Sequence, residues 1–212
     1  VIDSYAHERI GDAYLALGNA AEALKSYDQA VGSSRGLAPL LALREKLAAG
    51  YLNAGQVGNA VAQYDAILED ARNTGYRASI ALAAAHALDN AGNSALALAR
   101  YQDIVATYPE SVEGYRAMQA LLGAGTSVDH LQRARLSFVA GDYNDVVTAL
   151  HNYTTDTPIA RIDPVVYMML GRAYRELGNF QAANTAFETI LSQYPTTAYF
   201  GDAWLEQGRT LF

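Results

Sequence analysis

The residues that decide the fold are 171–195, GRAYRELGNFQAANTAFETILSQYP. Here a glycine, Gly178, separates two segments of helix length, and the same context of a small or apolar residue, glycine and a polar residue recurs along the chain. The earlier occurrences are Gly18, Gly55, Gly92 and Gly141, with gaps of 37, 37, 49 and 37 residues up to Gly178. A register sustained through five units predicts a repeat architecture.

Other positions keep the same register. Seven residues before each turn glycine lies a small residue: Gly11, Ala48, Ala85, Ala134 and Gly171, with Gly208 continuing the series. Five residues after the turn come Ala23, Ala60, Ala97, Val146 and Ala183, and nine residues after it come Tyr27, Tyr64, Tyr101, Leu150 and Phe187. This pattern predicts helical hairpins that cross closely through small side chains, while the large ones fill the space toward the neighbouring hairpin.

The predicted fold class is therefore all-α. Alanine is abundant and runs of Val, Ile and Thr are scarce, which favours helices over strands. Because no single hairpin could bury both of its faces, the hairpins are expected to stack as an α-solenoid. We expect about five hairpins, one extra helix and a truncated sixth unit.

The fifth unit resembles the tetratricopeptide repeat, through Tyr167, Leu170, Gly171, Tyr174, Gly178, Ala183, Phe187 and Pro195. The first unit resembles it through Ile10, Gly11, Tyr14, Gly18, Ala23, Tyr27 and Ala30. The period of 37 is longer than the family's usual 34 or so, and Arg35 and Arg72 stand where Pro109, Pro158 and Pro195 occur. The resemblance implies a stack of hairpins that binds a protein or peptide partner.

The predicted organisation is one continuous solenoid domain. Units 1–3 occupy residues 1–111, an extra helix and linker 112–126, units 4–5 residues 127–197, and the first helix of the truncated sixth unit 198–212. Ser111 is the expected N-cap of the extra helix, and Thr126 to Asp129 read as a capping box that opens the next helix. The extra helix is expected to change the superhelix direction; the alternative is a mere long connection.

The sixth unit is expected to leave an apolar surface uncovered. Its single helix carries Trp204, Leu205, Leu211 and Phe212 without a second helix to pack on them. Terminal units of solenoids need a polar outer face. We therefore expect a capping helix or another domain to follow.

Composition excludes several classes of partner and site. The chain has 212 residues, a formal net charge of −7 and a pI near 5.0, so nucleic acid is not an expected partner. It has no cysteine, which excludes disulfides and thiolate metal sites, and no stretch long and apolar enough to span a membrane. No cofactor and no metal site are expected.

No catalytic motif is recognisable, and the chain is predicted not to be an enzyme. The histidines His7, His86, His130 and His151 lie in different units without metal-ligand spacing. Glu8 and Asp12, one helical turn apart, could form an acid and base pair, but two solvated acids on a groove are the favoured interpretation.

Polar positions of the first helices are predicted to line a concave groove. They are Glu8, Asp12, Glu45, Asn53, His86, Asp89, Asn90, Arg135, Arg172, Arg175 and Arg209. This groove would run from mixed or acidic to basic and could hold an extended acidic or polar ligand at its C-terminal end. Ordinary solubilising charge is the alternative. Where relatives that clamp a terminal carboxylate carry Lys and Asn, this chain has Glu8 and Asp12, or Glu45 and Ala49, which disfavours that role.

A closer resemblance rests on DSYAHERIGDAYLALGNAAEAL, LREKLAAGYLNAG, TSVDHLQRARLSFVAGDYNDVVTAL and YPTTAYFGDAWLEQGRTLF. Together they resemble the helical region that precedes the catalytic domain in bacterial soluble lytic transglycosylases, which cleave peptidoglycan. This resemblance implies an extracytoplasmic setting in the periplasm or cell envelope, peptidoglycan contact through the parent enzyme, and a catalytic glutamate outside these residues. A free-standing scaffold for protein partners is the alternative function, and a cytoplasmic location stays open.

Overall fold

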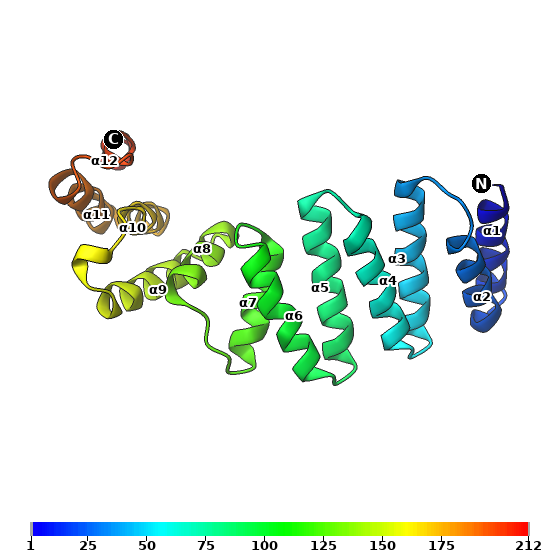
Figure 1. Ribbon diagram of the computed structural model, residues 1–212. Helices are drawn as coiled ribbons and strands as arrows, with labels where there is room; N and C mark the ends of the chain where they lie inside the picture. The colour runs from blue at the N-terminus through cyan, green and yellow to red at the C-terminus, as the bar shows by residue number, and fades with distance from the viewer. Residues whose placement is uncertain (1, 212) are drawn as a thin grey trace. The chain divides into compact units, whose positions relative to one another are not determined.

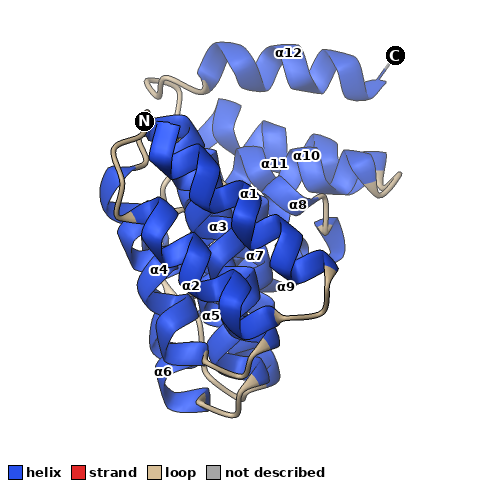
Figure 2. Ribbon diagram, turned by 90° about the vertical axis from the view of Figure 1, so that its right-hand side faces the viewer, coloured by secondary structure: helices blue, strands red, loops and turns tan. Residues whose placement is uncertain are grey.

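The computed structural model describes residues 2–211, and within them it contains α-helices, one short 3-10 helix and no strand (Figure 2). The predicted all-α class is confirmed. The elements are α1 (Ile2–Ala16), α2 (Ala20–Val31), α3 (Leu37–Asn53), α4 (Val57–Asp70), α5 (Thr74–Asn90), α6 (Ser94–Thr107), α7 (Val112–Gly123), α8 (His130–Ala140), α9 (Tyr143–Asp156), η1 (Ile159–Arg161), α10 (Val165–Glu176), α11 (Phe180–Gln193) and α12 (Phe200–Leu211).

The helices form two compact units, one up to Ile104 and one from Val105 onward. Within each unit, consecutive helices lie side by side, as α3, α4 and α5 do in Figure 1. The core of the first unit is built on Tyr27, Leu43, Leu47 and Ile67, all almost fully buried. The second unit has its own buried clusters, one around Val146, Leu150 and Val166 and one around Phe187 and Ile190. The prediction of a single continuous domain stays a prediction.

The turn glycines end the first helix of each hairpin as predicted. Gly18, Gly55, Gly92, Gly141 and Gly178 have φ between +71° and +76°, a left-handed conformation that glycine adopts without steric cost. The residue after each glycine donates its N–H to a carbonyl five residues earlier, as Asn179 does to Tyr174 at 2.8 Å. This bond closes a Schellman motif and satisfies a carbonyl at the helix end.

The polar residue after the turn glycine has a second task, because its side chain begins the next helix. The side-chain oxygens of Asn19, Asp142 and Asn179 accept from backbone N–H groups three residues on, at 3.4, 3.2 and 3.1 Å. Such N-caps satisfy an otherwise unpaired donor of the first helical turn. One Gly-Asn or Gly-Asp pair therefore stops one helix and starts the next.

Small residues let the two helices of a hairpin approach closely. A Cβ atom at Gly11 would lie 2.5 Å from Cε1 of Tyr27, and one at Gly171 would overlap the ring of Phe187. The rings of Tyr27 and Phe187 therefore rest on the glycine of their own hairpin, a contact that the sequence pattern had assigned mainly to the neighbouring unit. Only glycine fits there.

The predicted extra helix is present as α7, and Ser111 caps it by accepting from the N–H of Gly114 at 2.9 Å. The predicted start of the next helix at Thr126 is wrong. Gly125 has φ +75°, and the N–H of Thr126 donates back to Leu121, so these residues terminate α7. Helix α8 begins at His130, with Asp129 as its N-cap at 2.9 Å from the N–H of Gln132.

The last helix, α12, exposes the apolar residues that the sequence predicted. Trp204 is 58% exposed, and Leu205 and Leu211 are each 64% exposed. Its other face, formed by Ala203, Glu206, Gln207 and Thr210, is buried against the unit. The predicted role of Phe212 lies outside the described residues.

Candidate functional site

At the predicted acidic end of the groove, the carboxylates form ion pairs with basic side chains of the same chain. Lys46 of α3 contacts Asp12 and lies 3.4 Å from an oxygen of Glu8, and the hydroxyl of Tyr27 donates to Asp12 at 2.8 Å. Burial alone would raise the pKa of Asp12, but the hydrogen bonds from Lys46 and Tyr27 and the charge of Lys46 hold it below its usual value. These acids are paired and partly covered, which corrects the expectation of two solvated side chains.

Arg35 completes this cluster from the position where other units carry proline. Its guanidinium donates to Glu8 at 2.6 Å and lies 4.0 Å from the ring centre of Tyr5. The side chain is only 2% exposed. Arg35 thus closes the base of the first hairpin by charge and aromatic contact, where a proline would act through backbone rigidity.

The middle of the predicted groove stays exposed. Glu45, Asn53, His86, Asp89 and Asn90 all lie at the surface of the first unit. Glu45 accepts from the hydroxyl of Tyr76 at 2.5 Å, and Asp89 accepts from that of Tyr101 at 3.4 Å, while His86 packs edge-on against the same Tyr101 ring. In the second unit Arg135 is exposed as well. Binding at these residues stays a prediction.

The predicted basic end converges on a carboxylate that sequence reasoning missed. Arg172 and Arg175 of α10 both bind Glu206 of α12, and Arg209 lies 3.6 Å from it. The Glu206 side chain is 6% exposed. Burial alone would raise its pKa, but the hydrogen bond from Arg175 and the three guanidinium charges lower it. The guanidinium groups of Arg172 and Arg175 are therefore already paired with a carboxylate of the same chain, that of Glu206.

The repeat register could have revealed this pairing. Arg172 and Glu206 lie 160 positions after Asp12 and Lys46, the same offset that relates Gly11 to Gly171. An ion pair between consecutive first helices thus occupies the same place in both units, with its charges reversed. The sequence signal is the opposite charge carried by residues 34 positions apart on consecutive first helices, which a search along a single helix does not detect.

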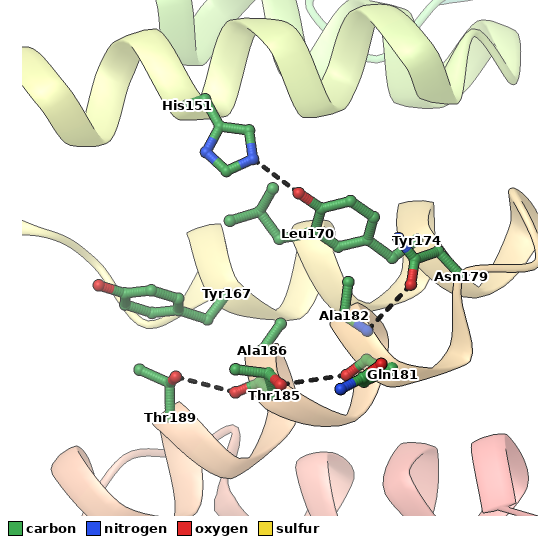
Figure 3. A pocket seen from close by; sticks show the side chains of 10 residues that line it. All are labelled: His151, Tyr167, Leu170, Tyr174, Asn179, Gln181, Ala182, Thr185, Ala186 and Thr189. Atoms are coloured by element: carbon green, nitrogen blue, oxygen red, sulfur yellow. Dashed lines mark hydrogen bonds between the residues drawn. The ribbon is translucent and has the colours of Figure 1, made fainter.

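An open pocket lies on another face of α10, between α9 and α11 (Figure 3). It has a volume of about 510 Å³. Tyr167, Leu170 and Tyr174 of α10 line it at helical spacing, Ala182 and Ala186 of α11 add apolar surface, and His151 comes from α9. The polar lining residues are Asn179, Gln181, Thr185 and Thr189. No lining residue is a Lys, Arg, Asp or Glu.

Two features fix the shape of the pocket. A ring nitrogen of His151 lies 2.6 Å from the hydroxyl oxygen of Tyr174, which ties α9 to α10 (Figure 3). Thr185 and Thr189 donate their hydroxyls to carbonyls one turn earlier in α11, at 3.1 and 2.9 Å. Their hydroxyl oxygens keep acceptor capacity, and the amide of Gln181 keeps both donors and acceptors. Burial raises the pKa of Tyr174, which keeps its phenol protonated.

Sequence reasoning missed this pocket because the groove was predicted only from polar positions of the first helices, whereas half of the lining lies on the second helix α11. In the sequence, Tyr167, Leu170 and Tyr174 stand out only as repeat positions of the fifth unit. The available signal was the run of uncharged polar residues on α11, since Gln181, Thr185 and Thr189 recur one turn apart beside that core.

The comparisons with known proteins identify the repeats. One family model, Tetratricopeptide repeat, matches residues 4–36, and another of the same description matches residues 166–197. These two segments are tetratricopeptide repeats. They correspond to the α1/α2 hairpin and to the α10/α11 hairpin that forms most of the pocket.

The solved structures that match this chain are low in identity. A tetratricopeptide repeat protein from Parabacteroides merdae ATCC 43184 is 18% identical, with a TM-score of 0.43, and the match covers 99% of this chain and 86% of that one. The TPR2AB domain of yeast Sti1, solved in a complex with pHSP90, is 15% identical, with a TM-score of 0.43 and coverage of 98% and 82%. No curated protein matches the sequence.

Other classes of site are not apparent in the part of the chain that the structure describes. Residues 2–211 contain no group of three or more His, Asp or Glu side chains placed to hold a metal ion. None of their helices has both the length and the apolar character that crossing a membrane requires.

Proposed function

We propose that this chain is a peptide-binding interaction module and that the pocket between α9, α10 and α11 holds a short, extended, uncharged segment of a partner protein. The observation that carries the proposal is the lining: aromatic and aliphatic side chains beside hydrogen-bonding groups, with no charge. Pockets of this composition bind apolar groups and orient them by a few polar contacts.

The dimensions support a short peptide. Tyr167 and Tyr174 lie seven residues apart on α10, which corresponds to about 10 Å along a helix. About three residues of extended chain span the same length. We expect one apolar side chain to lie against Leu170 and Ala186, with main-chain groups bonded to Gln181 and Thr185.

A peptide library tests this proposal. Random heptapeptides displayed on phage are selected on the purified chain, and the enriched peptides are measured by fluorescence anisotropy. Thr185→Arg should fill the pocket and weaken binding at least tenfold. The matched control is Thr148→Arg on α9, an exposed threonine outside the pocket that bonds its own helix in the same way. Equal binding by both variants would refute the pocket.

A finer proposal concerns the parent protein. The sequence resemblance supports a role as the helical body of a peptidoglycan-cleaving lytic transglycosylase outside the cytoplasm. Co-sedimentation with purified peptidoglycan sacculi tests it. We expect the chain to pellet with sacculi and not with cellulose of equal mass. Failure would remove the peptidoglycan proposal and leave the peptide-binding proposal intact.

A further inference from the structure

The bond between His151 and Tyr174 repeats a contact of the first unit. Asp28 and Tyr51 have the same register and lie 123 positions earlier in the chain. The hydroxyl of Tyr51 donates to Asp28 at 2.6 Å, and the hydroxyl oxygen of Tyr174 lies at the same 2.6 Å from Nε2 of His151. Each pair joins a second helix to the first helix of the next hairpin. A tyrosine bond at this place is therefore part of the repeat, and its partner changes from a carboxylate to an imidazole.

The groove beside this contact is bridged in the first unit and open in the second. Arg44 of α3 donates to Gln63 of α4 at 3.0 Å, and Arg100 of α6 forms an ion pair with Asp65 of α4 at 2.6 Å. Gln63 and Arg100 have the register of Ala186, which lines the pocket of the second unit. A methyl group cannot span the groove as those longer side chains do. The tyrosine that lines this pocket therefore borders open space, where an occupant can reach its hydroxyl group (Figure 3).

The partner of a tyrosine hydroxyl decides what else that hydroxyl can bind. An ionised carboxylate only accepts, so Tyr51 donates its hydrogen to Asp28. Four other tyrosines also donate to carboxylates: Tyr27, Tyr76, Tyr101 and Tyr115. An unprotonated imidazole nitrogen accepts in the same way. When Tyr174 donates to His151, its hydroxyl oxygen offers the pocket only lone pairs.

On the basis of the proposed function, we propose that His151 makes Tyr174 an acceptor and so selects a partner segment that presents a main-chain N–H to the Tyr174 oxygen. Every residue of an extended segment except proline carries such a donor. When His151 takes up a second proton, it donates from both ring nitrogens, and the hydrogen of Tyr174 is released to the pocket. The protonated site then favours a carbonyl oxygen at the same place. One proton on His151 therefore reverses which main-chain group the site prefers.

The titratable groups that face His151 are phenols. The ring of Tyr174 packs edge-on at 6.3 Å between ring centres, and Tyr167 lines the same pocket. The residues one turn away on α9 are uncharged: Val147, Thr148, Thr154 and Thr155. Charged residues of α8, α10 and α11 are bound elsewhere: His130 to Asp156, Arg133 to Asp145, Arg172 and Arg175 to Glu206, Glu176 to Arg175, and Glu188 to Asn184. Arg135 of α8 is exposed to solvent. Protonation of His151 is therefore the charge change that reaches Tyr174 between about pH 5 and pH 8.

Amide and ester versions of one peptide test the selection. The probe is the tightest-binding heptapeptide of the phage selection, acetylated, amidated and free of charged residues and histidine. Each main-chain N–H is replaced in turn by an ester oxygen, which removes one donor and keeps the shape. At pH 8 one ester should bind about fivefold more weakly than the amide, the effect of one neutral hydrogen bond. At pH 5, where histidine side chains are generally protonated, that loss should shrink below twofold.

Three variants assign the effect to these side chains. Tyr174→Phe should bind the amide and the ester equally at both pH values. His151→Asp copies Asp28 into the second unit, and because its carboxylate stays ionised at pH 5, the preference for the amide should persist at both pH values. His86→Asp is the matched control, at an exposed histidine of the first unit outside the pocket, and it should keep the pH dependence of the wild type.

NMR spectra of the chain labelled with 15N-histidine give a readout that needs no peptide. At pH 8, Nε2 of His151, assigned by the signals that His151→Asp removes, should be the unprotonated ring nitrogen. A proton on Nε2 at pH 8, or an amide preference that survives Tyr174→Phe or is equal at pH 5 and pH 8, would overturn the selection alone. Failure of every heptapeptide to bind would instead refute the proposed function, and the selection with it.

Discussion

The first and last hairpins place an ion pair at the same position with opposite polarity. In the first unit Asp12 of α1 binds Lys46 of α3; in the second unit Arg172 of α10 binds Glu206 of α12. In each unit the pair links one first helix to the next. Complementary charge therefore occurs at this position with either sign on either helix.

The reversal extends to the ring on the helix glycine. Tyr27 donates its hydroxyl to Asp12, while the residue at equal register, Phe187, has no hydroxyl. A guanidinium has no acceptor, so a tyrosine beside Arg172 would lose the bond that Tyr27 makes. The difference teaches that Asp with Tyr, and Arg with Phe, are two internally consistent solutions to one packing position.

The largest effect is expected where a ring covers the glycine. Gly171→Leu should destabilise the fold by about 3 kcal/mol, because the new side chain overlaps the buried Phe187 ring. Gly208→Leu, at equal register on α12, should cost less than about 0.5 kcal/mol, because no atom lies within 4 Å of a Cβ built at that position. Urea unfolding measures both. Similar losses at the two sites would show that register, rather than the covering ring, sets the cost.

Removing the buried member of the reversed pair should have the next largest effect. Glu206→Gln should cost about 2 kcal/mol at pH 7, less than for a fully buried pair because Arg172 and Arg175 reach solvent. The folded-state pKa of Glu206 is lowered, so its stabilisation is present above pH 4.5 and is lost as the pH falls through the lowered value. The difference between wild type and variant in urea unfolding should therefore shrink below pH 4.5. A constant difference down to pH 2 would contradict the ion-pair explanation.

Exchanging the polarity of the first pair tests whether the sign is free. Asp12→Arg alone should cost about 1 kcal/mol, because it faces Lys46 and removes the acceptor of Tyr27. Adding Lys46→Glu should recover at least half of the loss. Thermal unfolding of the single and double variants gives the coupling free energy between positions 12 and 46. Additive losses would show that Asp12 stabilises the fold independently of its pairing with Lys46.

The smallest effect is expected for Tyr27→Phe, which copies Phe187 into the first hairpin. It should cost about 0.5–1 kcal/mol in the wild-type chain, since one hydrogen bond to Asp12 is lost. In the background of Asp12→Arg and Lys46→Glu the same change should cost less, because the Asp12 acceptor of the Tyr27 hydroxyl is gone. Calorimetry on the wild type, Tyr27→Phe, the double variant and the triple variant checks this. An equal cost in both backgrounds would show that the Tyr27 ring acts independently of the ion pair.

The fold was predictable because its signals are local. Each turn glycine needs only its own backbone conformation, and each Asn or Asp after it needs only the next helical turn. The misplaced start of α8 had a local cause as well. Thr126 fits a capping box, but the Schellman bond after Gly125 claims its N–H for the end of α7.

The candidate site was less predictable because its contacts join different repeats. Whether Arg172 is free depends on Glu206, 34 residues away, and nothing on α10 itself shows that partner. The pocket between α9 and α11 likewise exists only once the hairpins are stacked. Periodicity finds the helices, and only the packed structure shows which of their polar residues remain available.

The left-handed backbone of the turn glycines has a consequence for chemical synthesis. At Gly55 φ is +71°. A D-alanine has its preferred conformation in this mirror-image region, so its backbone would adopt the turn without strain. It would also restrict the unfolded chain, as Gly-to-Ala changes do at compatible sites. Each turn is thus a place where a residue of opposite handedness should strengthen a protein of natural handedness.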